Sequence, residues 1–456
     1  MKKLLLIGAA TLIVSNSTFA GGLLTNTNQH AAFLRMLSRG ATTEIDGALS
    51  NPAGLAFLPK DGFHVGLSIQ SAYQTRNIDA SFMTYGLKDG VPGVLDKPYQ
   101  KYYEGTAAAP VIPSVFGAYK KGDWTISGFF AITAGGGKAS FDDGLPLFES
   151  AAMAGIFQSS IEAHKKNPQN PIMTPDMYNI TSAMDGKQYI YSLQLGLSYK
   201  ATEWLSVFGG GRMNYFTGGY KGFLNAIAKG SDTNLLPLAL DCDQTGWGLT
   251  PVIGVDAKLG KLNIGAKYEF KTNLNIENNT KDIKYPQTPE GAALVAPYQH
   301  GVNTPNDIPA MLSIAAAYEF IPVLRASVEY HFYDDKNAGM AGGKQKFLTK
   351  GTNEYLAGIE FDLTKQLTLS CGGQITDYGL SDNFQSDTSF SCDSYTLGFG
   401  AKVKMNKHLN LNIGYMWTTY EDYTKTSSNY NGTGLPGTNV YSRTNKVFGL
   451  SADYSF

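Results

Sequence analysis

The feature that most constrains this chain is a two-residue alternation of apolar and polar side chains, which recurs along the sequence after residue 60. In residues 409–417, one face carries leucine, isoleucine, tyrosine and tryptophan, and the other carries asparagine, glycine and methionine. Residues 262–270 and 355–363 repeat this pattern. A period of two is typical of β-strands with one apolar face, so we predict an all-β fold.

The polar faces of these strands carry full charges, which decides between two all-β architectures. The charged positions are Lys267, Glu269, Glu319, Arg325, Glu329, Glu360 and Lys402. Aliphatic side chains on the outside and charges on the inside are typical of a membrane barrel with a polar lumen. Only 16% of residues are charged, and the chain contains 27 tyrosines, 24 phenylalanines and 51 glycines, which fits the same class.

Short and long connections alternate along the predicted strands. The short ones are 121–123, 201–203, 259–261, 321–322, 364–366 and 405–407, and the long ones are 76–105, 138–186, 220–244, 278–307, 338–348, 378–389 and 424–440. This alternation is expected of periplasmic turns and extracellular loops. We therefore predict a transmembrane antiparallel β-barrel of about 14 strands, an even number as in bacterial barrels.

The first 60 residues do not share the strand pattern. Residues 1–20 combine a basic start at Lys2, an apolar run and the small-residue site Thr18-Phe19-Ala20, which predicts a signal peptide. We assign residues 21–60 to a separate N-terminal segment and residues 61–456 to the barrel. The predicted location is the outer membrane.

The N-terminal segment ends near the motif Asn51-Pro52-Ala53. Proline fixes its own φ and favours extended backbone at Asn51, whose amide can hold a turn. Together with residues 38–46 before it, this stretch resembles the hatch of FadL-type outer-membrane transporters for long-chain fatty acids. The resemblance extends to residues 355–358 and to the final strand, residues 447–456, which ends on an aromatic side chain.

This resemblance implies a barrel plugged by residues 21–60 that takes up hydrophobic compounds, long-chain fatty acids above all. It also implies capture in extracellular loops, transfer to an inner pocket, rearrangement of the hatch and lateral release. In the family the mature N-terminus lies near the inner pocket, so Leu23 is a candidate residue of that pocket. The expected partners are the hydrophobic ligand and outer-membrane lipid, and we expect a monomer.

Two long loops are unusually apolar, and a helix is predicted over 145–161. The candidate substrate contacts are Leu147, Phe148, Phe157, Phe223, Leu224, Leu236 and Leu238. Apolar surface facing water usually marks a binding site, although the two loops could instead pack on each other as a lid. Lys221 and Lys346 are candidate partners for a carboxylate, or solvated lysines of the rim.

Glycines interrupt the third predicted strand at Gly128, Gly135 and Gly136. Glycine within a strand weakens pairing and often marks a bulge. The resemblance implies a kinked third strand that opens the wall sideways, whereas the alternative is an ordinary strand end running into a loop.

Other classes of function lack a supporting pattern. The six histidines show no metal-ligand spacing and no nucleophile signature accompanies them, so we expect no enzyme, no cofactor and no metal. A net charge of −1 gives no indication of nucleic-acid binding. The remaining alternatives are an aromatic hydrocarbon channel of the same fold, a general porin, and a structural or adhesive barrel.

The three cysteines are Cys242, Cys371 and Cys392. Cys371 and Cys392 fall on opposite faces of the predicted hairpin, and side chains on opposite faces cannot bridge without a bulge. We therefore favour free thiols over a disulfide.

Overall fold

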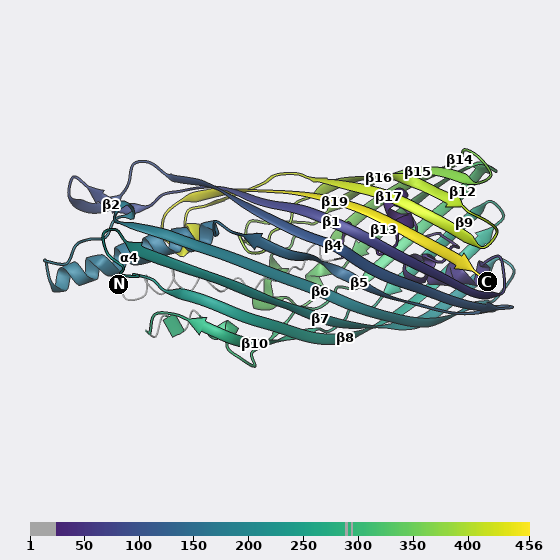
Figure 1. Ribbon diagram of the computed structural model, residues 1–456, viewed down its shortest axis with the longest axis horizontal. Coiled ribbons are helices and arrows are strands. Elements are labelled where there is room, and N and C mark those ends of the chain that lie inside the picture. The colour runs from purple at the N-terminus through teal and green to yellow at the C-terminus, as the bar shows by residue number, and fades with distance from the viewer. Residues whose placement is uncertain (1–23, 288–290, 293–294) are drawn as a thin grey trace.

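The computed structural model describes residues 24–287, 291–292 and 295–456. These residues form one antiparallel sheet that closes on itself, because β1 (Gly62–Phe82) pairs with β19 (Gly437–Ser455) along their full lengths. The result is an elongated barrel (Figure 1). It has 14 wall strands, as predicted. The predicted signal peptide, residues 1–20, and Leu23 lie outside the described residues.

Three of the wall strands are interrupted and carry two labels each. Between β1 and β19, the wall strands in chain order, with the two parts of each interrupted strand joined by "with", are β4 (Tyr99–Lys121), β5 (Trp124–Phe141), β6 (Tyr178–Lys200), β7 (Leu205–Ala228), β8 (Leu238–Leu259), β9 (Leu262–Glu269) with β10 (Asn275–Lys284), β11 (Asn303–Pro305) with β12 (Met311–Ile321), β13 (Leu324–Tyr333), β14 (Thr352–Asp362), β15 (Leu367–Asp377), β16 (Ser394–Lys404), and β17 (Leu409–Tyr420) with β18 (Tyr423–Ser427). Each pairs with its neighbours in sequence, so the topology is a simple meander.

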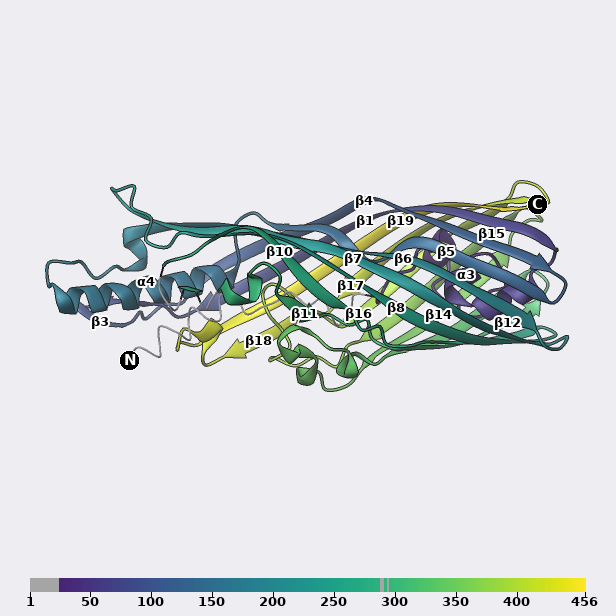
Figure 2. The same ribbon diagram turned by 90° about the horizontal axis from the view of Figure 1, so that it is seen from below.

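All six predicted short turns join strands at the end of the barrel that holds the C-terminus (Figure 1). The opposite end carries α4 (Pro146–Lys166), which includes the predicted helix, and a small hairpin of β2 (Tyr85–Lys88) and β3 (Val91–Val94) (Figure 2). Short 3-10 turns in the loops are η2 (Pro175–Met177), η3 (Ala296–Tyr298), η4 (Asp335–Asn337), η5 (Ala341–Phe347) and η6 (Tyr430–Gly432). Among the described residues, no helix is long and apolar enough to cross a membrane.

The predicted long loops are too long, because the strands continue beyond them. β1 runs to Phe82, and the ladder with β4 includes the pair Asp79 and Tyr102. The alternation persists there with its faces exchanged: Ile78 and Phe82 are fully buried inside. Above the membrane the outer face of the strands is in water, so apolar side chains occupy the inward-facing positions instead of the outward-facing ones. The pattern of outward-facing apolar side chains, from which the strands were predicted, is therefore missing there.

Within the membrane belt, the predicted faces are confirmed. Leu411 is 37% exposed on the outside, whereas its neighbour Asn412 is 2% exposed inside. Cys371 is exposed on the outer face, and Cys392 and Cys242 are buried. All three are free thiols, as predicted.

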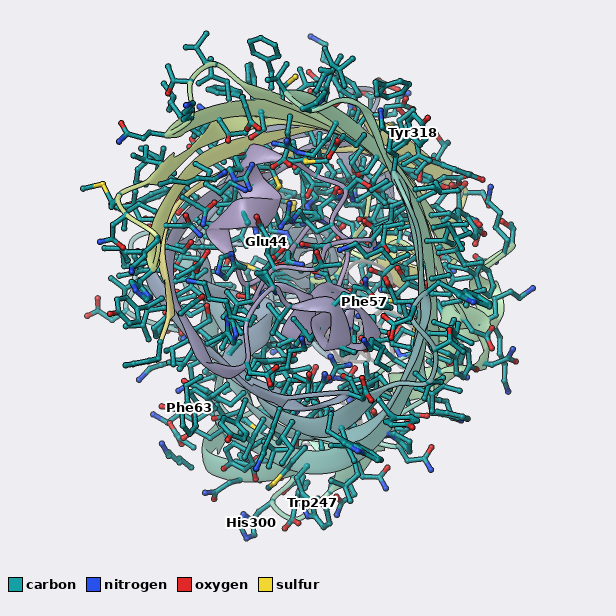
Figure 3. The ribbon with its side chains drawn as sticks, turned by 90° about the vertical axis from the view of Figure 1, so that its right-hand side faces the viewer. Glu44, Phe57, Phe63, Trp247, His300 and Tyr318 are labelled. Atoms are coloured by element: carbon teal, nitrogen blue, oxygen red, sulfur yellow. The ribbon has the colours of Figure 1, made fainter. Side chains whose placement is uncertain are left out.

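The N-terminal segment lies inside the barrel, toward the end with the short turns. Its elements are α2 (Ala31–Arg35), α3 (Gly47–Ser50) and the 3-10 helix η1 (Pro52–Phe57). Figure 3 shows Glu44 and Phe57 within the ring of strands, and Phe63 and Tyr318 on its outer side. Most residues of this segment are buried against the lumen wall.

Candidate functional site: two cavities in the lumen

The Asn51-Pro52-Ala53 motif fastens the N-terminal segment to the wall. The Asn51 amide nitrogen donates to the Thr42 carbonyl (2.9 Å) and to the Asp256 carboxylate of β8. Ala53 is fully buried, and its carbonyl accepts from Ser206 of β7 (2.7 Å). The motif therefore acts as an anchor, and none of its three residues borders a cavity described below.

Ion pairs add to this anchoring. Arg35 pairs with Glu360, and Lys402 pairs with Glu44 (2.6 Å). Burial alone would raise the pKa of the Glu44 carboxyl, but the charges of Lys402 and Arg39 hold that pKa well below its usual value. Both side chains of the Arg35–Glu360 pair are buried. Breaking a buried pair typically costs ~3–5 kcal/mol.

A first cavity, here called the inner cavity, lies in the lumen beside Thr25, Asn26 and Thr27. It occupies about 1010 Å³, including the part open to solvent. Its lining is mixed: aliphatic side chains come from the strands on either side, and the polar groups include two arginines. The aliphatic members are Ala72, Ala107, Ile112, Ala134, Ala139 and Val447.

The two arginines of the inner cavity, Arg76 and Arg443, are direct cross-strand partners in β1 and β19. Like charges placed opposite each other destabilise a sheet. Arg76 is only 8% exposed, and the buried Nε of Arg443 meets no hydrogen-bond acceptor among the described residues. Arg443 stacks on the Tyr420 ring, 4.6 Å from its centroid. The arrangement suits an anion, which would offset this repulsion.

The wall beside the inner cavity is irregular. The ladder between β4 and β5 is interrupted between the pair Ala108 and Lys138 and the pair Ser114 and Ala131. Gly135 and Gly137 have positive φ values of 103° and 84°, which glycine tolerates. Both border the inner cavity. Gly136 belongs to the same stretch of β5, but Gly128 is regularly paired with Gly117 and Leu195, so the break lies further along β5 than Gly128.

A second cavity, here called the outer cavity, lies between the strands and loops beyond the membrane belt. It occupies about 630 Å³, including its open part, and almost all of its exposed lining is apolar. Phe148 of α4, Leu224 of β7 and Leu238 of β8 border it, together with Leu240 and Ile283. Lys284 is the one cation of its described lining.

The structure brings most of the predicted loop residues together. Leu147, Leu224 and Leu238 share one buried cluster, against which Phe148 and Leu236 pack. The two loops therefore pack on each other, as a lid would, and they also border a cavity, as a binding site would. One predicted contact differs, because Phe157 is buried against Tyr85 (ring centroids 5.5 Å apart) and does not border the outer cavity. Phe223 borders this cavity and is 43% exposed.

The predicted lysines do not border either cavity. Lys221 is exposed and pairs with Asp241 (3.1 Å), and Lys346 is exposed in η5. The sequence interpretation missed Arg76, Arg443 and Lys284. The two arginines follow the inward-facing parity of β1 and β19, so this parity could have identified them. Residue 76, however, was assigned to the start of a loop.

A third cavity, of about 620 Å³, separates part of the N-terminal segment from the wall. It is lined by charged side chains, among them Arg212, Lys267, Glu269, Glu329 and His331. Within the described residues, no group of three or more histidine, cysteine or acidic side chains could hold a metal ion.

Comparisons with known proteins agree with this architecture. Residues 290–456 match the family described as outer membrane protein beta-barrel domain. No curated protein matches the chain. The fold is similar to that of a Pseudomonas aeruginosa FadL homologue, with 14% identity, a TM-score of 0.63, and 95% of this chain and 100% of that chain covered.

Two further solved structures are similar. They are the Pseudomonas putida toluene transporter TodX (13% identity, TM-score 0.53, 95% and 100% covered) and the Ralstonia pickettii toluene transporter TbuX (11%, 0.51, 96% and 98%). These likenesses establish the fold, a closed 14-stranded outer-membrane barrel of the FadL type. The protein is located in the outer membrane.

Proposed function

We propose that this barrel takes up hydrophobic compounds that carry an acidic head group, long-chain fatty acids above all, as a monomer. The observation that carries the proposal is the pair Arg76 and Arg443, placed opposite each other in a cavity with aliphatic walls. An apolar outer cavity next to a cationic inner one matches a molecule with a long tail and an anionic end.

The first step is capture in the outer cavity. Each buried methylene gains ~0.8 kcal/mol, so a 16-carbon chain gains roughly 12 kcal/mol before the entropic cost of binding. The Phe148, Leu224 and Leu238 side chains supply this contact. The ligand then moves to the inner cavity, where the arginines bind its carboxylate through charge-assisted hydrogen bonds.

Release then requires the inner site to be disrupted. Thr25, Asn26 and Thr27 border the inner cavity, and hydrogen bonds such as Asn26 N–H to Glu354 (2.9 Å) and the Thr25 hydroxyl with Tyr378 (2.7 Å) hold them to the wall. Buried ion pairs and the Asn51 anchor hold later parts of the segment. We therefore place the rearrangement of the hatch in its first residues, with residues 35–57 remaining attached to the wall.

The exit proposed is sideways, through the break between β4 and β5. The inner cavity reaches this break, and the alternative way down passes the charged third cavity. A hydrocarbon chain gains nothing by entering a charged, wet space, whereas the membrane receives it favourably.

A second candidate function is uptake of aromatic hydrocarbons, because TodX and TbuX are toluene transporters. The outer cavity would serve such ligands equally well, but a neutral ring leaves the two arginines without a role. A general porin is disfavoured by the N-terminal segment in the lumen, and its test is planar-bilayer conductance, which we expect to be small.

The test of the proposed function is a competition for uptake in cells that depend on this barrel. We expect excess palmitate to suppress uptake of labelled oleate and excess toluene to leave it nearly unchanged. Suppression by toluene and not by palmitate would assign the barrel to hydrocarbons.

The exit route has a separate test. Cysteines at Ile112 and Thr133, joined by a thiol cross-linker, would bridge the break, and we expect them to block uptake while ligand binding persists. The matched control is Val115→Cys with Phe130→Cys, a regular cross-strand pair, whose cross-link should leave uptake intact. Normal uptake through the barrel cross-linked at 112 and 133 would contradict the sideways exit.

A further inference from the structure

The two cavities share a wall, and one loop forms part of it. This loop, residues 378–393, joins β15 to β16 and folds inward, so that Phe384, Asp387 and Cys392 are buried. Thr388 borders the outer cavity, and Ser389 to Ser391 border the inner one. This loop, here called the partition loop, therefore lies against both cavities.

The tip of the partition loop is internally fastened. The Gln385 side chain closes it with two hydrogen bonds, donating to the Ser391 carbonyl (2.6 Å) and accepting from the Ser391 amide (3.1 Å). Within this ring, Ser386 and Ser389 form an isolated bridge. These local bonds make residues 385–391 a compact unit that can move without unravelling.

Three cations from other elements hold this unit by its backbone carbonyls. Lys344 of η5 donates to the Ser389 carbonyl (2.8 Å), and Lys425 of β18 donates to the Gln385 carbonyl (2.7 Å). Arg76 donates to the Phe390 carbonyl (3.4 Å). A carbonyl is a neutral acceptor, whereas a carboxylate brings a charge opposite to that of the cation to the hydrogen bond.

Asp387 adds attachments of the opposite sign. Its carboxylate accepts from the Leu147 amide at the start of α4 (2.7 Å), from the Tyr441 hydroxyl (2.8 Å) and from the Asn439 side-chain amide (2.8 Å). Phe390 packs on the Tyr441 ring (centroids 4.7 Å apart). Leu147 adjoins Phe148, which borders the outer cavity. An anionic ligand repels Asp387 and attracts the lysines, so it competes only at the cationic side of the tip.

We propose that residues 385–391 are a gate between the two cavities and that Lys344 and Lys425 make this gate selective for anionic ligands. The inference rests on the proposed uptake function. Neither lysine borders the outer or the inner cavity while the tip is in place, so the head group of an arriving acid meets them as the tip shifts. It then replaces the Ser389 and Gln385 carbonyls on the two lysines and holds the tip in its displaced position. A neutral ligand of the same length finds the same tail contacts but does not release the tip.

The chain contains its own reporter for this movement. Cys392 is fully buried directly after the tip, and burial raises the pKa of its thiol to about 11, so it reacts slowly while the gate is closed. Replacing Cys242 and Cys371 by alanine leaves Cys392 as the sole thiol. Its labelling by a sulfonated maleimide is then followed with palmitate, with methyl palmitate and with neither ligand.

We expect palmitate to speed the labelling of Cys392 by about tenfold or more and methyl palmitate to leave it unchanged. In Lys344→Met/Lys425→Met, labelling should be fast without ligand and insensitive to palmitate, because the tip has lost both ammonium contacts. The matched control is Lys346→Met, which lies in the same turn, is exposed and should behave as the parent.

The outcomes separate the gate from the uptake function. If the parent protein takes up palmitate but palmitate does not change the rate of Cys392 labelling, the proposal of a gate is wrong and the proposed uptake function is unaffected. If both ligands speed labelling equally, or the double lysine variant behaves as the parent, the selectivity is wrong. If palmitate is neither bound nor taken up, the proposed function fails and the gate with it.

Discussion

The outer and inner cavities lie next to each other in one lumen but are built for different parts of a ligand. The outer cavity is bordered by leucine, isoleucine and aromatic side chains and by a single described cation, Lys284. The inner cavity adds two arginines and several side-chain amides to aliphatic walls. Capture by the outer cavity is therefore non-directional and depends on apolar area, whereas binding in the inner cavity depends on charge and orientation.

This difference follows from how each strand meets its surroundings. Within the membrane, apolar side chains face lipid and the lumen receives the polar ones, as at Leu411 and Asn412. Beyond the membrane, apolar side chains such as Ile78 and Phe82 occupy the inward-facing positions. The apolar outer cavity and the charged inner cavity thus both follow from the alternation of side chains along the strands, whose outer face meets water in one part of the barrel and lipid in the other.

The largest expected effect comes from removing both arginines. Arg76→Met with Arg443→Met should weaken palmitate binding by about 100-fold or more, because each hydrogen bond to a charged group contributes ~1.5–3 kcal/mol. Binding of methyl palmitate should be unchanged, and the barrel should be no less stable, because a like-charge pair has gone. Isothermal titration in detergent measures the affinities, and Arg443→Lys, which keeps the charge, should lose less.

A smaller effect, of different specificity, is expected in the outer cavity. Phe148→Glu should reduce capture of acids and neutral hydrocarbons alike by about tenfold, because it removes part of a contact worth ~1.5–3 kcal/mol. Phe347→Glu is the control, since this side chain of η5 is 46% exposed and does not border the outer cavity. A loss confined to acids in Phe148→Glu would contradict the division of labour between the cavities.

The gate predicts a dependence on pH. Burial, aided by the charges of Lys425 and Arg76, lowers the pKa of Lys344 to about 7, so this lysine is charged below that pH and neutral above it. The preference for an anionic over a neutral ligand should fall several-fold between about pH 6 and about pH 8. Hexadecanesulfonate, which stays ionised throughout, is the suitable anion. The preference of Lys344→Met should vary less with pH than that of the parent, and burial, which also lowers the pKa of Lys425, accounts for what variation is left.

The smallest effect is expected at Lys284. This side chain is 67% exposed and 3.8 Å from Asp282, so Lys284→Ala should weaken capture of acids by about twofold at most and leave hydrocarbons unaffected. Lys221→Ala, which removes a lysine paired with Asp241, should change neither. A tenfold loss in Lys284→Ala would move head-group recognition to the outer cavity.

The sequence predicted the fold because alternation and turn spacing are local signals. The short turns and the helix after Leu145 could be read this way, whereas the position of the segment that contains Asn51 followed from its resemblance to a known hatch. Parity alone could have placed Arg76 and Arg443 on the inner face, but their pairing could not be read, because it depends on the register between the first and last strands. Nor could local pattern distinguish Lys344, which holds the partition loop, from Lys346 two residues later, because a 3-10 turn sets their directions.

The most direct test of the central claim, that the inner cavity recognises an acidic head group, is a crystal structure of the protein with palmitate bound. The account predicts the carboxylate within hydrogen-bond distance of Arg443 and Arg76, with the chain along Ala72, Ile112 and Val447. A chain in the inner cavity whose carboxylate points away from both arginines, toward Arg212 or Lys267 of the third cavity, would contradict it.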